Sequence, residues 1–128
     1  MPRILIAEDD DAVREFVARA LALQGHEVTA VMDGGKALEA LAASPYDLLL
    51  TDIVMPGMDG IALALKVAKS HPALPVLLMT GYAAERQRAH NLDALICRVL
   101  LKPFTLKEVC GAVAEVLADR GIATPRRA

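Results

Sequence analysis

Acidic residues that directly follow apolar runs are the first positions in this sequence that could do chemistry. Glu8, Asp9 and Asp10 follow one such run, and Asp52 follows another. If these side chains meet in one pocket, each close pair repels by about 4 kcal/mol at an effective dielectric constant near 20. A cation relieves that repulsion, and a set of oxygen ligands suits Mg²⁺ better than zinc. The pattern therefore predicts a magnesium site.

Two later apolar runs also end in polar groups. Thr80 offers a hydroxyl, Gly81 leaves its backbone N–H open to approach, and Lys102 carries a compact positive charge. Phosphoryl transfer needs an in-line nucleophile, a bridging metal and donors for the equatorial oxygens. A carboxylate can be the nucleophile and form an aspartyl phosphate. Asp52 stands apart from the acidic residues at 8–10, so we expect it to be that nucleophile.

Each of these residues taken singly also has a structural interpretation. An acidic residue after a strand can cap the next helix, which is what we expect of Asp10, and residues 8 and 9 could do the same. Asp52 could be a loop aspartate, Thr80 a strand-end hydroxyl and Lys102 a surface amine. Only their combination at one edge of a sheet favours the chemical interpretation.

The elements that must position these residues alternate along the chain. Short apolar runs predict strands at about 3–7, 27–31, 46–51, 75–80 and 95–101. Apolar positions at helical spacing, which include Phe16 in the first helix, predict helices at about 12–24, 35–44, 59–70, 83–92 and 105–118. Thr105 is expected to cap the last of these helices. The segment at 83–92 is polar almost all round, so we expect that helix to be loosely packed and mobile. Five βα units imply an α/β fold with a doubly wound parallel sheet.

Strand composition predicts the order of the sheet. The first, third and fourth strands are continuous apolar runs, as strands buried on both faces are. The second contains Glu27 and Thr29 and the fifth contains Arg98, which is typical of edge strands. These features fit the flavodoxin-like order 2-1-3-4-5. In that order ligands bind at the carboxyl ends of the strands, beside the switch between strands one and three.

Composition limits the class of protein. The 128 residues fit one domain, and 55% hydrophobic against 23% charged residues excludes disorder. A net charge of −2 and 3% aromatic residues argue against nucleic-acid binding. The apolar runs are far shorter than the about 18 residues that span a bilayer, and the acidic start is no signal peptide. We expect a cytoplasmic domain at 1–119 and a short basic tail at 120–128 without an output domain.

At these residues the sequence resembles the receiver domains of two-component response regulators, over residues 3–118. The resemblance is carried by Glu8-Asp9, by DIVMPGMDG at 52–60, by Thr80-Gly81-Tyr82 and by Lys102-Pro103-Phe104. It implies that Asp52 accepts a phosphoryl group from a histidine kinase or histidine phosphotransferase.

The resemblance also assigns roles around Asp52. Asp9, Asp52 and the carbonyl of Val54 would bind Mg²⁺ directly, with Glu8 acting through water. Thr80 would follow the phosphoryl group on activation, and Lys102 would pair with it. The peptide bond before Pro103 is expected to be cis.

Two departures from the family pattern affect the expected behaviour. The acidic pair is Glu-Asp instead of Asp-Asp, and the position three before Lys102, usually Tyr or Phe, is Val99. Tyr82 is the nearby aromatic that could replace it, although a β-branched residue is also ordinary in an edge strand. Val54 and Tyr82 flank the expected path of the hydrolytic water, so we expect a long-lived phosphoryl group.

Without an output domain, the signal would pass by binding a protein. The stretches AEDDDA, MTGYAA and LKPFTLKEV resemble stand-alone receivers that, when unphosphorylated, promote substrate delivery to the ClpXP protease. The ClpX unfoldase is therefore a candidate partner. The family's usual switching face is formed by the fourth helix, the fifth strand and the fifth helix.

Three other functions are alternatives to this one. A phosphatase of the haloacid-dehalogenase kind needs a second Asp at position 54, where this chain has Val54. A flavin or nucleotide carrier needs a phosphate-binding glycine loop, and the sequence contains neither GxGxxG nor GxxxxGK. A receiver-like module that takes no phosphate would not need the intact set of Asp9, Asp52, Thr80 and Lys102.

Overall fold

The computed structural model describes residues 2–81 and 97–121. Within these residues the strands are β1 (Arg3–Ala7), β2 (Glu27–Val31), β3 (Leu48–Asp52), β4 (Val76–Thr80) and β5 (Cys97–Leu101). The helices are α1 (Asp11–Leu23), α2 (Gly34–Ala43), α3 (Gly60–Ser70) and α5 (Leu106–Asp119). The helix expected at 83–92 lies outside the described residues.

The five strands form one parallel sheet in the order β2-β1-β3-β4-β5, so the predicted order is confirmed. Every residue of β3 and β4 is buried, whereas β2 is only partly covered. At the other edge Arg98 of β5 is exposed and makes ion pairs with Glu115 and Asp119 of α5. The polar interruptions in the sequence therefore marked the edges correctly.

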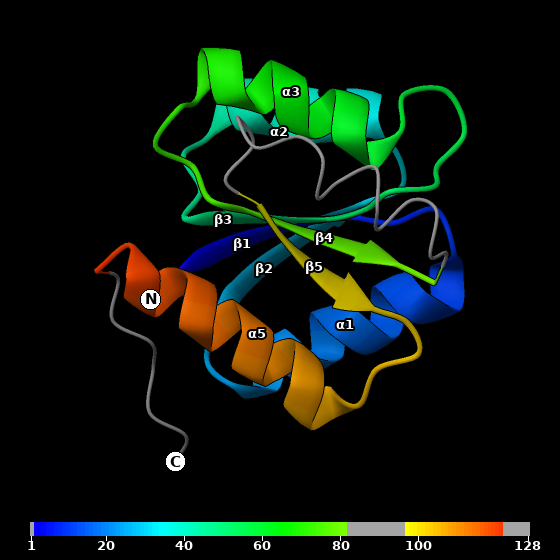
Figure 1. The fold of residues 1–128 in the computed structure, drawn as a ribbon, viewed down its shortest axis with the longest axis vertical. Coiled ribbons are helices and arrows are strands. Elements are labelled where there is room, and N and C mark those ends of the chain that lie inside the picture. Colours follow the sequence, from blue (N-terminus) through cyan, green and yellow to red (C-terminus); the bar gives the residue numbers. More distant parts are fainter. Residues whose placement is uncertain (1, 82–96, 122–128) are drawn as a thin grey trace.

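The described helices cover the two faces of the sheet (Figure 1). Helices α2 and α3 lie on one face, and α1 and α5 lie on the other. Successive strand side chains point to opposite faces, so Leu5 joins the core beneath α2 and α3 while Ile4 and Ile6 join the core beneath α1 and α5. No helix in the described part of the chain is long and apolar enough to cross a membrane.

Two predicted helix starts are confirmed. The Asp10 side chain caps α1 by accepting a hydrogen bond from the N–H of Val13 at 3.0 Å. Thr105 caps α5 in a reciprocal capping box with Glu108. These caps fix where the loops at the carboxyl edge of the sheet end.

The predicted apolar face of α1 was wrong at Phe16. Its buried residues are Val17, Ala20 and Leu21, whereas Phe16 is 42% exposed. The ring lies instead beside that of Phe104, with a centroid separation of 6.4 Å. Phe16 sits in the half of α1 near the carboxyl edge, where a cavity opens in place of the core.

The third strand begins two residues later than expected and includes Asp52. The guanidinium of Arg3 lies over the ring of Tyr46, with 4.8 Å between the Arg3 Cζ and the ring centroid. The Asp47 carboxylate accepts a hydrogen bond from the Arg3 N–H. The Asp47 N–H also donates to the Arg3 carbonyl at 2.8 Å, and the strand itself begins at the next residue, Leu48. Asp52 is the last residue of β3 and is fixed by the sheet rather than by a loop.

Candidate functional site

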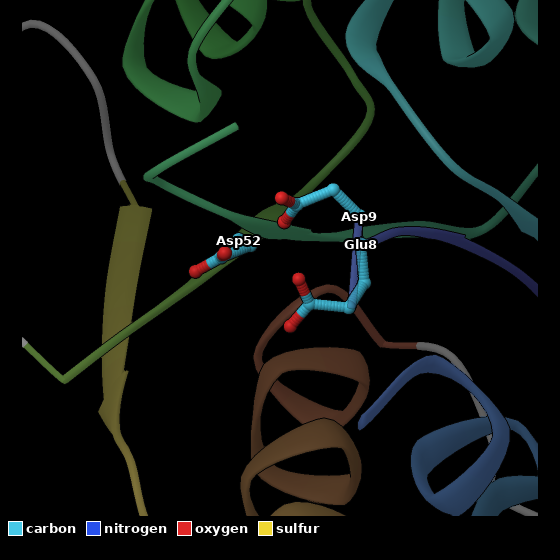
Figure 2. A group of neighbouring side chains, drawn as sticks. All are labelled: Glu8, Asp9 and Asp52. Carbon is cyan, nitrogen blue, oxygen red and sulfur yellow. The ribbon is translucent and has the colours of Figure 1, made fainter. Parts of the chain in front are cut away.

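The carboxyl edge of the sheet brings three carboxylates together. One oxygen from each of Glu8, Asp9 and Asp52 lies within 4.8 Å of the others. Figure 2 shows the three side chains converging from the ends of two neighbouring strands. Glu8 and Asp52 are buried, and Asp9 is exposed. The convergence expected from the sequence is therefore present.

The backbone around Asp52 is packed very closely. The chain returns past Asp52 where α3 begins, and the Gly60 N–H donates to the carbonyl of Ile53 at 2.8 Å. A Cβ at position 60 would lie 2.1 Å from the Asp52 carbonyl oxygen. Thr51 donates its hydroxyl to the same oxygen at 3.0 Å. Glycine at 60 is thus a condition for the position of Asp52.

Lys102 places an ammonium group among the carboxylates. Its Nζ donates to Glu8 Oε1 at 2.6 Å and lies 3.2 Å from Asp52 Oδ1. The Lys102 N–H donates to the Thr80 carbonyl at 2.9 Å, which ties the end of β5 to the end of β4. The peptide bond between Lys102 and Pro103 is cis, as the resemblance implied. Residues 94 positions apart in sequence are therefore in direct contact.

Burial and pairing set the protonation of this cluster. Burial raises the pKa of Glu8 to about 7, and the nearby charge of Asp52 acts in the same direction, against the hydrogen bond from Lys102. Burial alone would lower the pKa of Lys102, but its bonds to Glu8 and Asp52 raise it overall. Lys102 is therefore an ammonium at neutral pH, while the Glu8 carboxyl takes up a proton more readily than an exposed glutamate does.

A cavity of about 840 Å³ opens over the carboxylates. One part of its wall is the acidic cluster with Gly81 and Lys102. The other part is apolar and is made by Ala12, Val13, Phe16, Val54, Pro103 and Phe104. Asp52 therefore lies in the wall of a cavity that is open to the outside.

The other predicted site residues lie in different parts of the structure. Thr80 ends β4 and is buried, and Val54, a residue that is 44% exposed, lines the cavity. Val99 of β5 lies opposite Leu78 of β4 and packs against the core beneath α2 and α3. Tyr82 lies outside the described residues.

Sequence reasoning missed two groups that support the cluster. Arg14 donates a hydrogen bond to the Glu8 carbonyl, and Thr51 donates to that of Asp52. Their signal was weak, because an arginine seven residues after a strand end and a threonine inside a strand are both ordinary. Phe16 was noticed, but it was assigned to the core instead of the cavity.

The fold and this site define the class of protein. The model of the response regulator receiver domain family matches residues 4–114. The chain therefore belongs to the response regulator receiver family and is a phosphoacceptor of two-component phosphorelays rather than a classical enzyme. Proteins of this family are phosphorylated by histidine kinases.

The chain is also similar to individual response regulators. The chain is 41% identical over 117 residues to the response regulator receiver protein CpdR of Brucella abortus, a match that covers 91% of this chain and 98% of that protein. It is 36% identical over 115 residues to the response regulator MprA of Mycobacterium ulcerans, covering 90% of this chain but 50% of MprA.

Solved structures agree with the fold. The response regulator TrrA of Thermotoga maritima, in complex with Mg²⁺ and BeF, has a TM-score of 0.83 at 29% identity, covering 91% of this chain and all of that one. A CheY-like receiver from Methanospirillum hungatei has a TM-score of 0.87 at 28% identity, covering 94% and 97%.

Proposed function

We propose that this receiver accepts a phosphoryl group on Asp52 in a Mg²⁺-dependent reaction and signals by binding a protein in a phosphorylation-dependent way. The observation that supports this most is the meeting of three carboxylates beside the Lys102 ammonium, at the floor of an open cavity. Carboxylates so close together are costly without a cation. One of them, Asp52, is held in place by the sheet and by Gly60.

The donor set fits Mg²⁺. Carboxylate oxygens are the ligands that this ion prefers, and it commonly keeps positions open for phosphate oxygens. Asp9, Asp52 and the carbonyl of Val54 would hold the ion directly, and Glu8 would act through water. When bound, the ion neutralises the charge that develops on the phosphoryl oxygens. The TrrA structure, a relative at 29% identity, was solved with Mg²⁺ and BeF.

Asp52 is the nucleophile in this proposal. One of its carboxylate oxygens attacks the phosphorus of a phosphohistidine, a P–O bond forms, and the P–N bond breaks as the imidazole nitrogen keeps the electron pair. Lys102, 3.2 Å from Asp52 Oδ1, stabilises the charge on the phosphoryl oxygens. Thr80, at the end of the neighbouring strand, would donate its hydroxyl to the same group, and Gly81 its N–H.

The proposed phosphoryl group is long-lived. Hydrolysis needs a water molecule in line with the P–O bond. The exposed apolar side chain of Val54 borders the cavity there, and Tyr82 is the second residue that we expect to hinder this water. Val99 leaves the core without the usual aromatic, so coupling of Thr80 to the switching face would have to pass by another route.

The downstream partner belongs to the same proposal. The similarity to CpdR, together with the sequence stretches that resemble stand-alone receivers, supports a role in substrate delivery to the ClpXP protease. The chain would then act in the cytoplasm as a receiver at 1–119 with a short tail at 120–128. ClpX itself is the partner to test first.

Intact mass measurement tests the phosphoacceptor directly. The protein is incubated with acetyl phosphate, with and without Mg²⁺, beside Asp52→Ala and the surface control Glu39→Gln, whose carboxylate is on α2. We expect one added phosphoryl group in the wild type and the control, only with Mg²⁺, and none in Asp52→Ala. No added mass in the wild type would favour the inert module, and turnover of phosphate monoesters would favour the phosphatase.

Partner capture tests the signalling role. Immobilised ClpX is exposed to the untreated protein and to protein treated with Mg²⁺ and beryllofluoride. We expect the untreated form to bind more strongly, because the resembling proteins act when unphosphorylated. Equal retention of the two forms, or none, would contradict the ClpXP role and leave the phosphoacceptor chemistry intact.

A further inference from the structure

Arg14 holds the loop that supplies two of the three carboxylates. Its guanidinium donates a hydrogen bond to the backbone carbonyl of Glu8 at 2.9 Å and pairs with the carboxylate of Asp11. The side chain is 20% exposed and does not line the cavity. Arg14 therefore contacts the site only through the loop backbone.

Apart from the bond from Lys102 to the Glu8 carboxylate, the other bonds of this loop are made by backbone groups and by the acidic side chains themselves. The Glu8 N–H donates to the Val31 carbonyl at 3.1 Å, which extends the pairing of β1 with β2 by one residue. The Asp10 side chain caps α1, as described above. Arg14 adds a long side chain that reaches from the first turns of the helix back to the strand end.

The carbonyl that Arg14 holds belongs to the peptide group that joins Glu8 to Asp9. That peptide group is planar, so a fixed carbonyl also fixes the direction in which the chain enters Asp9. Both carboxylates flanking this peptide point into the acidic cluster (Figure 2). A rotation of the peptide would move the Asp9 carboxylate relative to that of Asp52.

We propose that Arg14 is a positioning residue for divalent-cation binding: it locks the Glu8–Asp9 peptide so that the two carboxylates face Asp52. This inference rests on the proposed Mg²⁺ site and deepens it. A guanidinium can bind a carbonyl and a carboxylate at the same time in fixed directions, whereas a lysine ammonium lacks that planar fork. The geometry, as well as the charge, therefore matters at position 14.

Three variants on α1 separate these contributions. Arg14→Met removes both the charge and the fork, and Arg14→Lys keeps only the charge. Arg19→Met is the matched control, since Arg19 lies on the same helix, is 78% exposed and makes only a 3.9 Å pair with Glu15. Binding of Mn²⁺ is measured from the loss of the free ion's paramagnetic resonance signal, and the melting temperature is recorded with and without Mg²⁺.

Groups that orient metal ligands are worth about 10-fold to 100-fold in affinity. We expect Arg14→Met to weaken Mn²⁺ binding about 10-fold or more, Arg14→Lys to recover only part of that loss, and Arg19→Met to bind as the wild type does. The rise in melting temperature on adding Mg²⁺ should shrink in the two Arg14 variants only. A purely structural arginine would instead lower the melting temperature equally with and without Mg²⁺.

Affinity in Arg14→Met equal to that of Arg19→Met would overturn the inference, as would full recovery in Arg14→Lys. If Arg14→Met does not fold, the comparison of Arg14→Lys with the wild type decides in the same way. The failure of the proposed function looks different: the wild type itself would then bind no Mn²⁺ and take no phosphoryl group from acetyl phosphate.

Discussion

The amino ends and the carboxyl ends of the strands form two opposite edges of the parallel sheet, the amino edge and the carboxyl edge. Charged groups are arranged differently at these two edges. At the amino edge, Arg3 pairs with each of its polar neighbours. Its backbone N–H donates to the Asp47 carboxylate, and its guanidinium donates to the Pro45 carbonyl and lies over the Tyr46 ring. Its Nε also lies 3.7 Å from Oε2 of Glu27. At the carboxyl edge, three carboxylates lie close together, and the ammonium of Lys102 contacts two of them, Glu8 and Asp52.

The difference separates a structural edge from a functional one. The charges of Arg3 and its partners at the amino edge are paired within the protein, so they stabilise the fold and leave no excess charge to attract a ligand. The excess of negative charge at the carboxyl edge is unfavourable in isolation and becomes favourable when a divalent cation binds. Local conflict of this kind is expected where a protein keeps a site for function.

The largest effect should come from closing the space behind Asp52. Gly60→Ala would place a Cβ 2.1 Å from the Asp52 carbonyl oxygen and 2.9 Å from the Ile53 Cα, and backbone atoms cannot move aside cheaply. We expect a loss of about 3 kcal/mol or more in the free energy of unfolding, measured by urea denaturation, together with loss of phosphorylation.

Gly111→Ala is the matched control for that change. Gly111 lies inside α5 with no atom within 4 Å of an added Cβ, so the same substitution should stabilise the protein by about 1 kcal/mol or less. Equal effects of the two substitutions would show that the carboxyl edge is not closely packed around Asp52.

The next largest effect is the loss of stability on removing a cationic side chain, Lys102 at the carboxyl edge or Arg3 at the amino edge. Lys102→Met leaves the buried Glu8 carboxyl without its 2.6 Å partner, and we expect the metal-free protein to lose about 2 kcal/mol. Arg3→Met should cost about 1 kcal/mol. Mg²⁺ should narrow the difference in stability between Lys102→Met and the wild type, but it should leave the difference between Arg3→Met and the wild type unchanged, because the cation site of Arg3→Met is intact.

Urea denaturation of both variants, with EDTA or with Mg²⁺, measures this difference. A Lys102→Met protein that gains no more from Mg²⁺ than Arg3→Met does would contradict the assignment of the carboxyl edge as a cation site.

The smallest effect concerns His26, an exception at the amino edge. Its Nδ1 is buried and lacks a hydrogen-bond partner within the described residues, and burial lowers the pKa of its imidazole below the usual 6.5. The folded state thus favours the neutral ring, and this contribution to stability is lost as pH falls through the histidine range.

We expect His26→Gln to lose less stability than the wild type between about pH 7.5 and about pH 5.5. His71→Gln is the control, since that ring lies at the end of α3 and bonds the Ser70 hydroxyl in an exposed position. A wild-type slope in His26→Gln would show that the burial of His26 is not linked to its protonation.

Much of the fold was predictable because the signals were local or periodic. The apolar runs of β3 and β4 and the polar interruptions in β2 and β5 gave the strand order. Asp10 and Thr105 were recognisable as caps from their residue types. The predicted start of β3 was two residues early, because the apolar pattern does not show that Tyr46 and Asp47 contact Arg3 ahead of the strand.

The candidate site was predictable in its members but not in its support. Topology alone brings the ends of β1 and β3 together, so the convergence of Glu8, Asp9 and Asp52 followed from the sequence. The bond from Arg14 to a backbone carbonyl depends on the side-chain conformation, which residue type does not reveal. Phe16 was misplaced because helical periodicity does not say where a helix extends past its sheet.

The crystal structure of the protein with Mg²⁺ and beryllofluoride tests the central claim most directly. We expect density for the beryllofluoride on a carboxylate oxygen of Asp52, a metal ion bound by Asp9 and Asp52, and the Lys102 ammonium moved from Glu8 to a fluorine. Density for neither group at Asp52, with Lys102 still bonded to Glu8, would contradict the claim that this edge is a phosphoryl-accepting site.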